Sequence, residues 1–353
     1  MKLLVRATNW VGDAILSIPA LSALRARWPH AEIAVLARPW VADLYRDQDL
    51  VDRMIPFDHR GQHRGVSGIE RLARELRAQH FDSALLFQNA FEAAWIVWRA
   101  GIPERIGYAR DARGPLLTRP IPVPLPGEIP PHEANYYLEL LRRAGWIQAL
   151  PDLPPVRLRV AADALERAEK FLSDAGSPPG SLRVAFGSGA AYGTAKCWPA
   201  NRYSDLARRL VAEYGAQVLL FGAASEAPVA AEVESGAGQG VINLIGRSAI
   251  GDLPALLARC HLFIGNDSGA MHVAAAVGLP VVAVFGPTDP HGTRPLASQL
   301  SIVQRKVACS PCFLRHCPID HRCMKFVDLE MVLDAARGWL ASLPARKGQE
   351  TRG

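Results

Sequence analysis

The sequence predicts an α/β protein built from two Rossmann-like, doubly wound domains that face one cleft. Short apolar runs of the strand type alternate with amphipathic helical segments through both halves of the chain. Three prolines within residues 151–155 separate the halves, as an interdomain linker would. Because βαβα order produces a parallel sheet covered on both faces, we expect ligands beyond the C-terminal ends of the strands.

The first domain is expected to cover residues 1–150. Its first helix places Ile15, Ile18, Leu21 and Leu24 on one apolar stripe. The same patterns predict strands at 3–5, 32–36, 53–57, 83–87 and 106–108, and helices at 14–28, 41–45, 69–79, 93–100 and 133–146.

The second domain is expected to cover residues 151–327, followed by a C-terminal helix at 328–343 and a flexible tail at 344–353. The alternation predicts strands at 183–186, 218–221, 241–244, 262–264 and 281–285, and helices at 163–175, 203–214, 227–234, 252–258 and 270–277. At 353 residues, about half of them apolar, the chain is long enough to form two cores.

Composition narrows the functional class. No run approaches the ~20 apolar residues that span a bilayer, and the N-terminus lacks a secretory signal, so we expect a cytoplasmic protein. The net charge of +6 comes from scattered arginines, which favours an anionic substrate or a membrane surface over nucleic acid.

The clearest site pattern lies at residues 262–290. An apolar strand runs into the turn from Gly265 to Gly269, and a small-residue helix containing His272 follows. Free N–H groups and the helix dipole favour an anion at this helix N-terminus, near Asp267 and Ser268. The competing interpretation treats Asp267 as an ordinary helix cap.

Two further loops follow strand ends in the same half. The Gly-rich loop with Ser188 and Gly189 leads to Lys196, and such backbone amides plus one lysine can hold a diphosphate. Glu226 follows the next strand, where a carboxylate can accept two hydroxyl donors from a ribose. A surface lysine and a helix N-terminal acid are the competing interpretations.

The first domain offers Asp13, which follows Gly12 where the first helix begins. A carboxylate held ionised there can accept a proton from a hydroxyl, although for an isolated Gly-Asp at a helix start capping is the simpler role. The segment lacks a GxGxxG fingerprint, which disfavours a nicotinamide enzyme.

Cysteines form a separate pattern near the C-terminus. Cys309, Cys312, Cys317 and Cys323 have the spacing C-x2-C-x4-C-x5-C, which fits a small structural zinc site in a cytosolic protein. A reduced or partly disulfide-bonded loop is the alternative.

Taken together, the motifs resemble the ADP-heptose lipopolysaccharide heptosyltransferases of glycosyltransferase family 9, most closely the heptosyltransferase II group. They keep the family's order along nearly the whole chain: Asn9-Trp10-Val11-Gly12-Asp13, Gly189-Ala190 with Ala195-Lys196-Cys197-Trp198-Pro199, Phe221-Gly222 with Glu226, Asn266-Asp267-Ser268-Gly269 with Met271-His272-Val273-Ala274-Ala275-Ala276, and Gly286-Pro287-Thr288. Ser188 departs from the proline that many relatives carry before the Gly-Ala pair.

The resemblance implies a GT-B architecture and an inverting transfer of heptose from ADP-heptose without a catalytic metal or other cofactor. The acceptor would be heptosyl-Kdo2-lipid A, reached by peripheral contact with the cytosolic face of the inner membrane. It implies that Asp13 is the general base, that Lys196 neutralises the leaving diphosphate and that Glu226 holds the ribose. Asp267 would then meet the heptose, with Ser268 and Gly269 amides on the phosphates and His272 supporting them.

For the phosphates and carboxylates of the acceptor, guanidinium groups in the first half are the expected partners. Arg60 and Arg64 are the first candidates, followed by Arg105, Arg110, Arg113 and Arg119. Two other functions stay open: another nucleotide-sugar enzyme on the same fold, such as an epimerase or hydrolase, and a non-catalytic nucleotide-sugar-binding protein.

Overall fold

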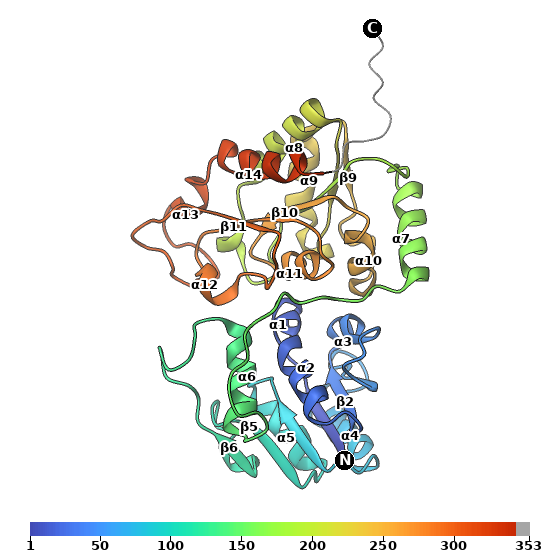
Figure 1. Ribbon diagram of the computed structural model, residues 1–353, viewed down its shortest axis with the longest axis vertical. Coiled ribbons are helices and arrows are strands. Elements are labelled where there is room, and N and C mark those ends of the chain that lie inside the picture. The colour runs from blue at the N-terminus through green and yellow to red at the C-terminus, as the bar shows by residue number, and fades with distance from the viewer. Residues whose placement is uncertain (344–353) are drawn as a thin grey trace. The chain divides into compact units, whose positions relative to one another are not determined.

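The computed structural model describes residues 1–343, and the tail predicted at 344–353 lies outside the described residues. Two compact units are present, each built on a parallel six-stranded sheet with flanking helices (Figure 1). This confirms the predicted α/β class with two doubly wound sheets.

The first unit comprises residues 1–162, 249–254 and 290–298. Its sheet has the order β3-β2-β1-β4-β5-β6, so the strand order reverses between β1 and β4. The strands are β1 (Lys2–Arg6), β2 (Glu32–Ala37), β3 (Arg53–Pro56), β4 (Ser83–Leu86), β5 (Glu104–Tyr108) and β6 (Arg119–Ile121). The helices are α1 (Val11–Leu16), α2 (Ile18–Arg27), α3 (Pro39–Tyr45), α4 (Gly65–Arg77), α5 (Phe91–Arg99), α6 (Glu133–Arg143) and α12 (Pro290–Thr293).

The central strand of this sheet is buried. Leu3, Leu4 and Val5 of β1 are fully buried, and Leu3 lies opposite Ile33 of β2 on one side and Ser83 of β4 on the other. Strands buried on both faces read as continuous apolar runs, which is why the sequence predicted them well.

The single helix predicted at 14–28 is wrong, because the structure divides it into α1 and α2 at Ser17. Pro19 has no N–H to donate into an unbroken helix. The Ala14 carbonyl instead accepts hydrogen bonds from Ser17 Oγ at 2.8 Å and from Tyr45 Oη at 2.9 Å. The break leaves α1 as a short helix that carries Asp13.

The second unit comprises residues 163–248, 255–289 and 299–353, described to residue 343. Its order β12-β11-β10-β7-β8-β9 repeats the first unit's topology, with the reversal between β7 and β10. The strands are β7 (Arg183–Gly187), β8 (Gln217–Leu220), β9 (Val241–Asn243), β10 (Leu262–Asn266), β11 (Val281–Phe285) and β12 (Leu300–Gln304). The helices are α7 (Ala162–Asp174), α8 (Ala200–Tyr214), α9 (Ala227–Ala237), α10 (Leu253–Leu257), α11 (Gly269–Ala276), α13 (Arg322–Lys325) and α14 (Leu329–Ala341).

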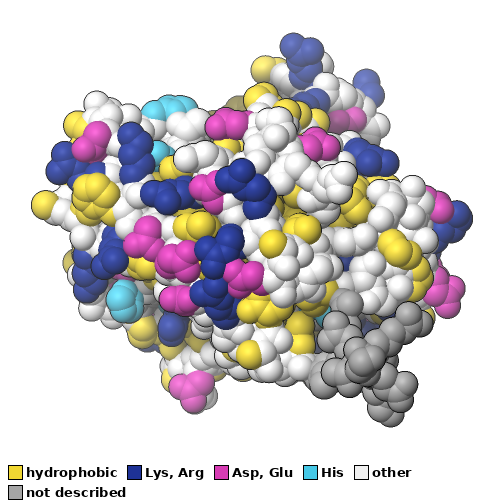
Figure 2. Space-filling view, turned by 90° about the horizontal axis from the view of Figure 1, so that it is seen from above, with side chains coloured by type: hydrophobic (Ala, Val, Ile, Leu, Met, Phe, Trp, Pro, Cys, Tyr) yellow, Lys and Arg dark blue, Asp and Glu magenta, His cyan; other side chains and the backbone are white. Residues whose placement is uncertain are grey.

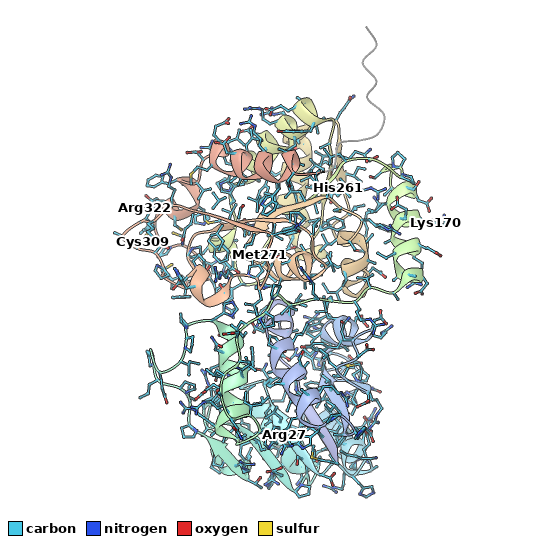
Figure 3. All side chains as sticks on the ribbon, viewed as in Figure 1. Arg27, Lys170, His261, Met271, Cys309 and Arg322 are labelled. Carbon is cyan, nitrogen blue, oxygen red and sulfur yellow. The ribbon has the colours of Figure 1, made fainter. Side chains whose placement is uncertain are left out.

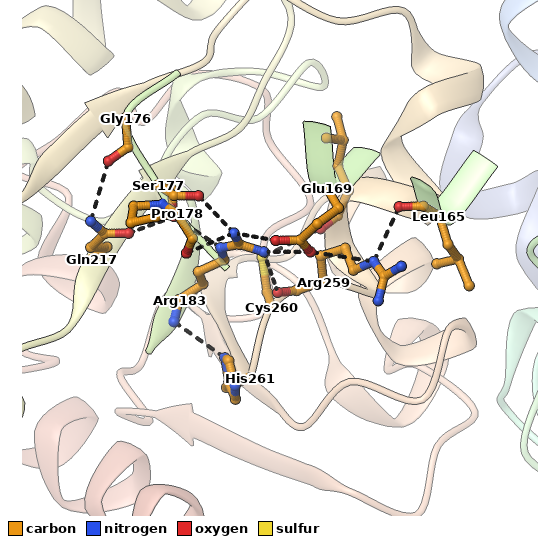
Figure 4. A network of polar contacts seen from close by, with 11 residues as sticks. Leu165, Glu169, Gly176, Ser177, Pro178, Arg183, Gln217, Arg259, Cys260 and His261 are labelled. Atoms are coloured by element: carbon orange, nitrogen blue, oxygen red, sulfur yellow. Dashed lines mark hydrogen bonds and ion pairs between the residues drawn. The ribbon is translucent and has the colours of Figure 1, made fainter. Parts of the chain in front are cut away.

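An ion pair with a buried arginine connects α7 to this sheet. Arg183 at the start of β7 is 3% exposed and donates to both carboxylate oxygens of Glu169, at 2.7 and 3.0 Å (Figure 4). Ser177 supplies its hydroxyl and its carbonyl to the same guanidinium. Because Glu169 and Ser177 accept hydrogen bonds from the Arg183 guanidinium, its charge lies under the helix without being left uncompensated.

The C-terminal helix α14 packs against β10, β11 and β12, as Figure 1 shows. Acidic and basic side chains are interspersed across the face seen in Figure 2, rather than gathered into a band of one sign. Among the described residues, no helix combines the length and the apolar character that crossing a membrane requires.

Candidate functional site

The loops of the second unit meet at its point of strand reversal. Strands β7 and β10 are neighbours, with Gly187 opposite Gly265, so the loops that follow them leave the sheet side by side. Lys196 Nζ lies 2.6 Å from Asp267 Oδ2 as a result. Ligands of open α/β sheets bind at such reversals, beyond the strand C-termini.

This ion pair is largely withdrawn from solvent. The side chains of Lys196 and Asp267 are 13% and 5% exposed, and Thr288 Oγ1 donates to the same carboxylate oxygen at 2.8 Å. The Lys196 ammonium also lies 4.9 Å from the centre of the Tyr192 ring. Several contacts therefore hold the ammonium in one position.

The Asn266 side chain connects the loop that follows β7 to the end of β10. Its side-chain amide donates to the Ser188 carbonyl at 2.7 Å, and its Oδ1 accepts from the Trp198 amide and the Tyr203 hydroxyl, each at 2.9 Å. Asn266, Trp198 and Tyr203 are all buried. Asn266 therefore fixes both ends of the loop that carries Lys196.

Two hydroxyls at this locus lack partners. The Oγ atoms of Ser188 and Ser268 are buried and make no hydrogen bond to any residue between 1 and 343. Ser268 is the N-cap of α11, and its side chain does not cap the helix. Buried hydroxyls are nearly always paired, so two orphans beside a helix N-terminus mark a place for polar ligand atoms.

Glu226 lies against the same loop. Its carboxylate accepts from the Ala223 amide at 2.8 Å, and burial raises the pKa of Glu226 above its ordinary value. The Gly189 backbone passes so close that a Cβ there would lie 2.2 Å from Glu226 Cδ. The structure thus brings Ser188, Gly189 and Glu226 together, while His272 is buried within α11.

The cysteines occupy one edge of this unit. Figure 3 labels Cys309 and Arg322 at this edge. All six cysteines are free thiols, and burial, followed by the charges of the other three clustered thiols, raises the pKa of Cys323 to about 11. Within residues 1–343, no group of three or more potential ligands is arranged to hold a metal ion, so the structural zinc site stays a prediction without structural support.

In the first unit, Asp13 lies on α1 among other acidic groups. The Asp13 charge acts on Glu133 at the start of α6 and on Tyr45 and Tyr137. Burial and then the Asp13 charge raise the pKa of Glu133 to about 7, against a hydrogen bond from Tyr137. Asp13 therefore has a second carboxyl group beside it that is half-protonated near neutral pH.

A cationic cluster surrounds Asn9, just after β1. Arg6 and Arg38 donate to Asn9 Oδ1 at 2.9 and 3.0 Å, and the Trp40 indole donates to the Asn9 carbonyl at 3.0 Å. The Arg60 guanidinium lies 5.8 Å from the centre of the Trp40 ring. Arg6 is fully buried, and burial lowers its pKa to about 10.

His59 belongs to the same surroundings, with its ring 5.5 Å from that of Trp40. Burial and the charges of Arg38 and Arg60 lower the pKa of His59. Arg64 is exposed, as Arg60 is, and lies at the N-cap of α4. The contact with the Trp40 ring places Arg60 in the Asn9 cluster.

The expectation that Arg113 offers a free guanidinium is wrong. This side chain is fully buried and donates to the Tyr108 carbonyl at 2.8 Å and to Asn89 Oδ1 at 2.9 Å. Arg105 donates to the Leu116 carbonyl and Arg119 pairs with Glu104, so both serve the local fold. Guanidiniums that satisfy loop carbonyls cannot be told from ligand-binding ones by sequence position.

Several contributors to these sites were not predicted. Arg38 directly follows β2, and the rule applied to the other strand ends would have found it. Thr288 lay within the recognised Gly286-Pro287-Thr288 motif without an assigned role, whereas no short-range pattern reveals Glu133. Asn266 lay within a recognised motif without an assigned role.

Comparison with known proteins decides the family. The profile described as glycosyltransferase family 9 (heptosyltransferase) matches residues 69–322, well over half of the chain. The chain belongs to glycosyltransferase family 9. This family 9 chain is 32% identical over 309 residues to lipopolysaccharide heptosyltransferase 2 of Salmonella typhimurium and to that of Escherichia coli, covering 86% of this chain and 88% of each relative.

Solved structures agree with this assignment. The family 9 chain matches the structure of E. coli ADP-heptose lipopolysaccharide heptosyltransferase II with a TM-score of 0.82 and 29% identity, covering 98% of this chain and all of that one. A family 9 glycosyltransferase from Veillonella parvula has the same fold, with a TM-score of 0.83 at 24% identity over 96% of this chain and 97% of that one. The protein is therefore a GT-B glycosyltransferase related to enzymes of lipopolysaccharide heptose transfer, as the motifs predicted.

Proposed function

We propose that this enzyme transfers heptose from ADP-heptose to the first heptose of the lipopolysaccharide inner core. The observation that carries the proposal is the cluster of polar side chains at the β7–β10 reversal. It combines the Lys196–Asp267 pair with two unpartnered buried hydroxyls at the N-terminus of α11. The similar E. coli protein named ADP-heptose lipopolysaccharide heptosyltransferase II supports the choice of donor.

In this proposal the second unit binds the donor. Lys196 and the α11 amides at Ser268 and Gly269 stabilise the charge that grows on the departing diphosphate, because a fixed cation and helix dipole need no rearrangement during reaction. Glu226 accepts hydrogen bonds from the ribose hydroxyls, and Ser188 with Gly189 lines the phosphates. Asp267 contacts the heptose, and His272 supports the phosphate region from within α11.

Asp13 is the proposed general base, which takes the proton of the acceptor hydroxyl as that oxygen attacks the anomeric carbon. The bond to ADP breaks as the new glycosidic bond forms, with inversion. The Asp13 carboxylate interacts with a second acid, since burial and then the Asp13 charge raise the pKa of Glu133 to about 7.

The cationic cluster of the first unit is the proposed site for the anionic groups of heptosyl-Kdo2-lipid A. Arg60 is exposed beside Arg38 and His59, and paired guanidiniums are suited to phosphate and carboxylate. Arg64 would make an outer contact from the start of α4. Because the acceptor is lipid-linked, we place the enzyme at the cytosolic face of the inner membrane as a peripheral protein.

The test is transfer of heptose from ADP-heptose to a heptosyl-Kdo2-lipid A acceptor, followed by mass spectrometry of the product. Release of ADP that requires no acceptor would indicate a hydrolase, and conversion of the donor sugar alone would indicate an epimerase. Donor binding without turnover on any acceptor would indicate a binding protein. Transfer to Kdo2-lipid A instead would move the activity to the first core position.

A further inference from the structure

Residues 310–324 form a segment, here called the bracket, that contacts the two segments carrying the partners of Asp267. On one side the bracket meets the turn that carries Thr288, since the amides of Cys312 and Phe313 donate to the Pro287 carbonyl at 3.0 and 2.8 Å. The Ser310 hydroxyl donates to the Gly286 carbonyl in the same turn.

On its other side the bracket meets the loop that carries Lys196. The Tyr192 hydroxyl donates to the Phe313 carbonyl at 2.8 Å, and the Ala195 amide donates to the Arg315 carbonyl at 2.9 Å. Gly193 lies against the same backbone, where a Cβ would stand 2.3 Å from the Arg315 oxygen. The loop and the bracket are therefore in backbone contact where no larger residue fits.

His321 makes the contact nearest to Lys196. Its Nε2 lies 2.7 Å from the Ala195 carbonyl, the peptide group that joins Ala195 to Lys196. A carbonyl can only accept, so Nε2 carries the proton and donates.

The backbone of His321 is held in an uncommon conformation. Its φ is +61°, in the left-handed region that few non-glycine residues adopt. Its amide donates to Cys317 Sγ at 3.3 Å, and its carbonyl accepts from the amides of Met324 and Lys325 at 3.1 Å. Met324 is fully buried in the core of the unit. Such conformations persist only where the surroundings fix them, and many are found at functional sites.

We propose that His321 is a positioning residue for the donor site, which sets the Lys196 ammonium by holding the Ala195 peptide. The inference rests on the proposed function, since it assigns His321 to the diphosphate cation named there. A line of contacts supports it: buried Met324 anchors α13, α13 fixes His321, His321 holds Ala195, and Lys196 reaches Asp267. His321 itself is not a catalytic residue.

Two substitutions at His321 separate the effect of the side-chain hydrogen bond to Ala195 from the effect of the left-handed backbone conformation. His321→Asn suits the left-handed backbone, because asparagine tolerates positive φ, but its amide is too short to reach Ala195. His321→Gln keeps a donor with nearly the reach of Nε2 but tolerates that backbone less well. We expect His321→Asn to keep the wild-type melting temperature and to lower kcat roughly five- to tenfold, the cost of one positioning hydrogen bond. We expect His321→Gln to lower the melting temperature and to keep the wild-type kcat.

A matched control is available in the first unit. His80 is an exposed histidine with φ of +54°, at the end of α4. His80→Asn makes the same chemical change on the same backbone conformation, and it should leave kcat unchanged. A loss of kcat in both asparagine variants would overturn the proposal.

The deciding measurement is a double-mutant cycle between His321→Asn and Lys196→Ala, with kcat expressed per ADP-binding site. If His321 acts through Lys196, the asparagine change lowers kcat in wild type and has no further effect in Lys196→Ala. Equal losses in both backgrounds, or an unchanged kcat for His321→Asn, would overturn the inference while leaving the proposed function intact. A wild-type kcat for Lys196→Ala alone would instead overturn the role of Lys196 in the proposed function.

Discussion

Lys196 Nζ and Asp267 Oδ2 are 2.6 Å apart, although the two residues are separated by 71 positions in the chain. The cation assigned to the donor diphosphate is thus neutralised by an acid from the neighbouring strand end. An ammonium fixed in this way needs little rearrangement when negative charge develops nearby. The same pairing links stability and activity, and the variants below separate the two.

Lys196→Ala should lower kcat by about 10²–10³, the usual effect of removing one preorganised group that stabilises developing negative charge. It should also cost about 3–5 kcal/mol of stability, because the buried Asp267 carboxylate loses its cation. Combining it with Asp267→Asn should restore much of the melting temperature without restoring kcat. Recovery of kcat in the double variant would contradict the assignment.

Gly189→Ala should weaken donor binding through Glu226. The new Cβ would lie 2.2 Å from Cδ and 2.3 Å from Oε1 of that carboxyl group, which must swing away and lose the Ala223 amide. We expect KM for ADP-heptose to rise roughly tenfold, since hydrogen bonds to the ribose are lost. Gly338→Ala in α14, where nothing lies within 4 Å of the added Cβ, is the control and should bind donor as wild type does.

Glu133→Gln should change how stability depends on pH. The pKa of Glu133 rises from 4.5 to about 7 on folding, so between these values the unfolded chain loses a proton that the folded protein keeps. Wild-type stability should therefore fall as pH rises from about 4.5 to about 7, with this loss complete above pH 7. Melting temperatures measured across this window should fall less steeply for Glu133→Gln, whereas exposed Glu166→Gln should follow the wild-type curve.

Asp13→Asn should lower kcat by about 10²–10⁴, the contribution expected of a general base, with little change in the KM for donor. The substitution is nearly isosteric, so melting temperature should change little. Removing the Asp13 charge should also lower the pKa of Glu133, because that charge helps to raise it. Activity at the wild-type level would show that Asp13 only caps α1.

Arg60→Ala should raise the KM for a phosphorylated core acceptor roughly tenfold while leaving the KM for ADP-heptose unchanged, because it removes one charge-assisted contact. Arg27→Ala is the matched control, since Arg27 also lies over a tryptophan ring, 5.5 Å from Trp28, at the C-terminal end of α2. Figure 3 labels Arg27 on that helix. If both variants lose acceptor affinity equally, general surface charge and not the Asn9 cluster binds the acceptor.

Most elements were predictable because both sheets are parallel and buried. The strand at 281–285 has the predicted bounds, and Val281 to Phe285 are all fully buried. Of the four strands at the sheet edges, β3 and β9 were predicted and β6 and β12 were not. Strand β6 has only three residues, with Pro120 at its centre, and β12 is half-exposed along most of its length. The α1–α2 break was missed although Pro19 is a local signal for it. The Tyr45 hydroxyl that donates to the Ala14 carbonyl at the break is brought there only by folding.

The site was predictable where function lies at strand ends. Lys196, Glu226 and Asp267 each follow an apolar run, and the doubly wound topology brings such ends together. The surroundings of these groups were not predictable. The residues near Asp13 in the chain do not predict that Glu133 lies close to it. The residues near Lys196 do not predict that the bracket, residues 310–324, contacts the loop that carries Lys196.

By itself the sequence determined the fold class, the family motifs and the strand ends that carry polar groups, because these depend on local apolar patterns and on turn residues. Only the tertiary structure decided which charges are neutralised and which hydroxyls are left without partners. It also decided that the Arg113 side chain is buried and hydrogen-bonded within the unit, while Arg60 lies at the surface. Burial and pairing are relations between distant segments, so they exist only once the chain has folded.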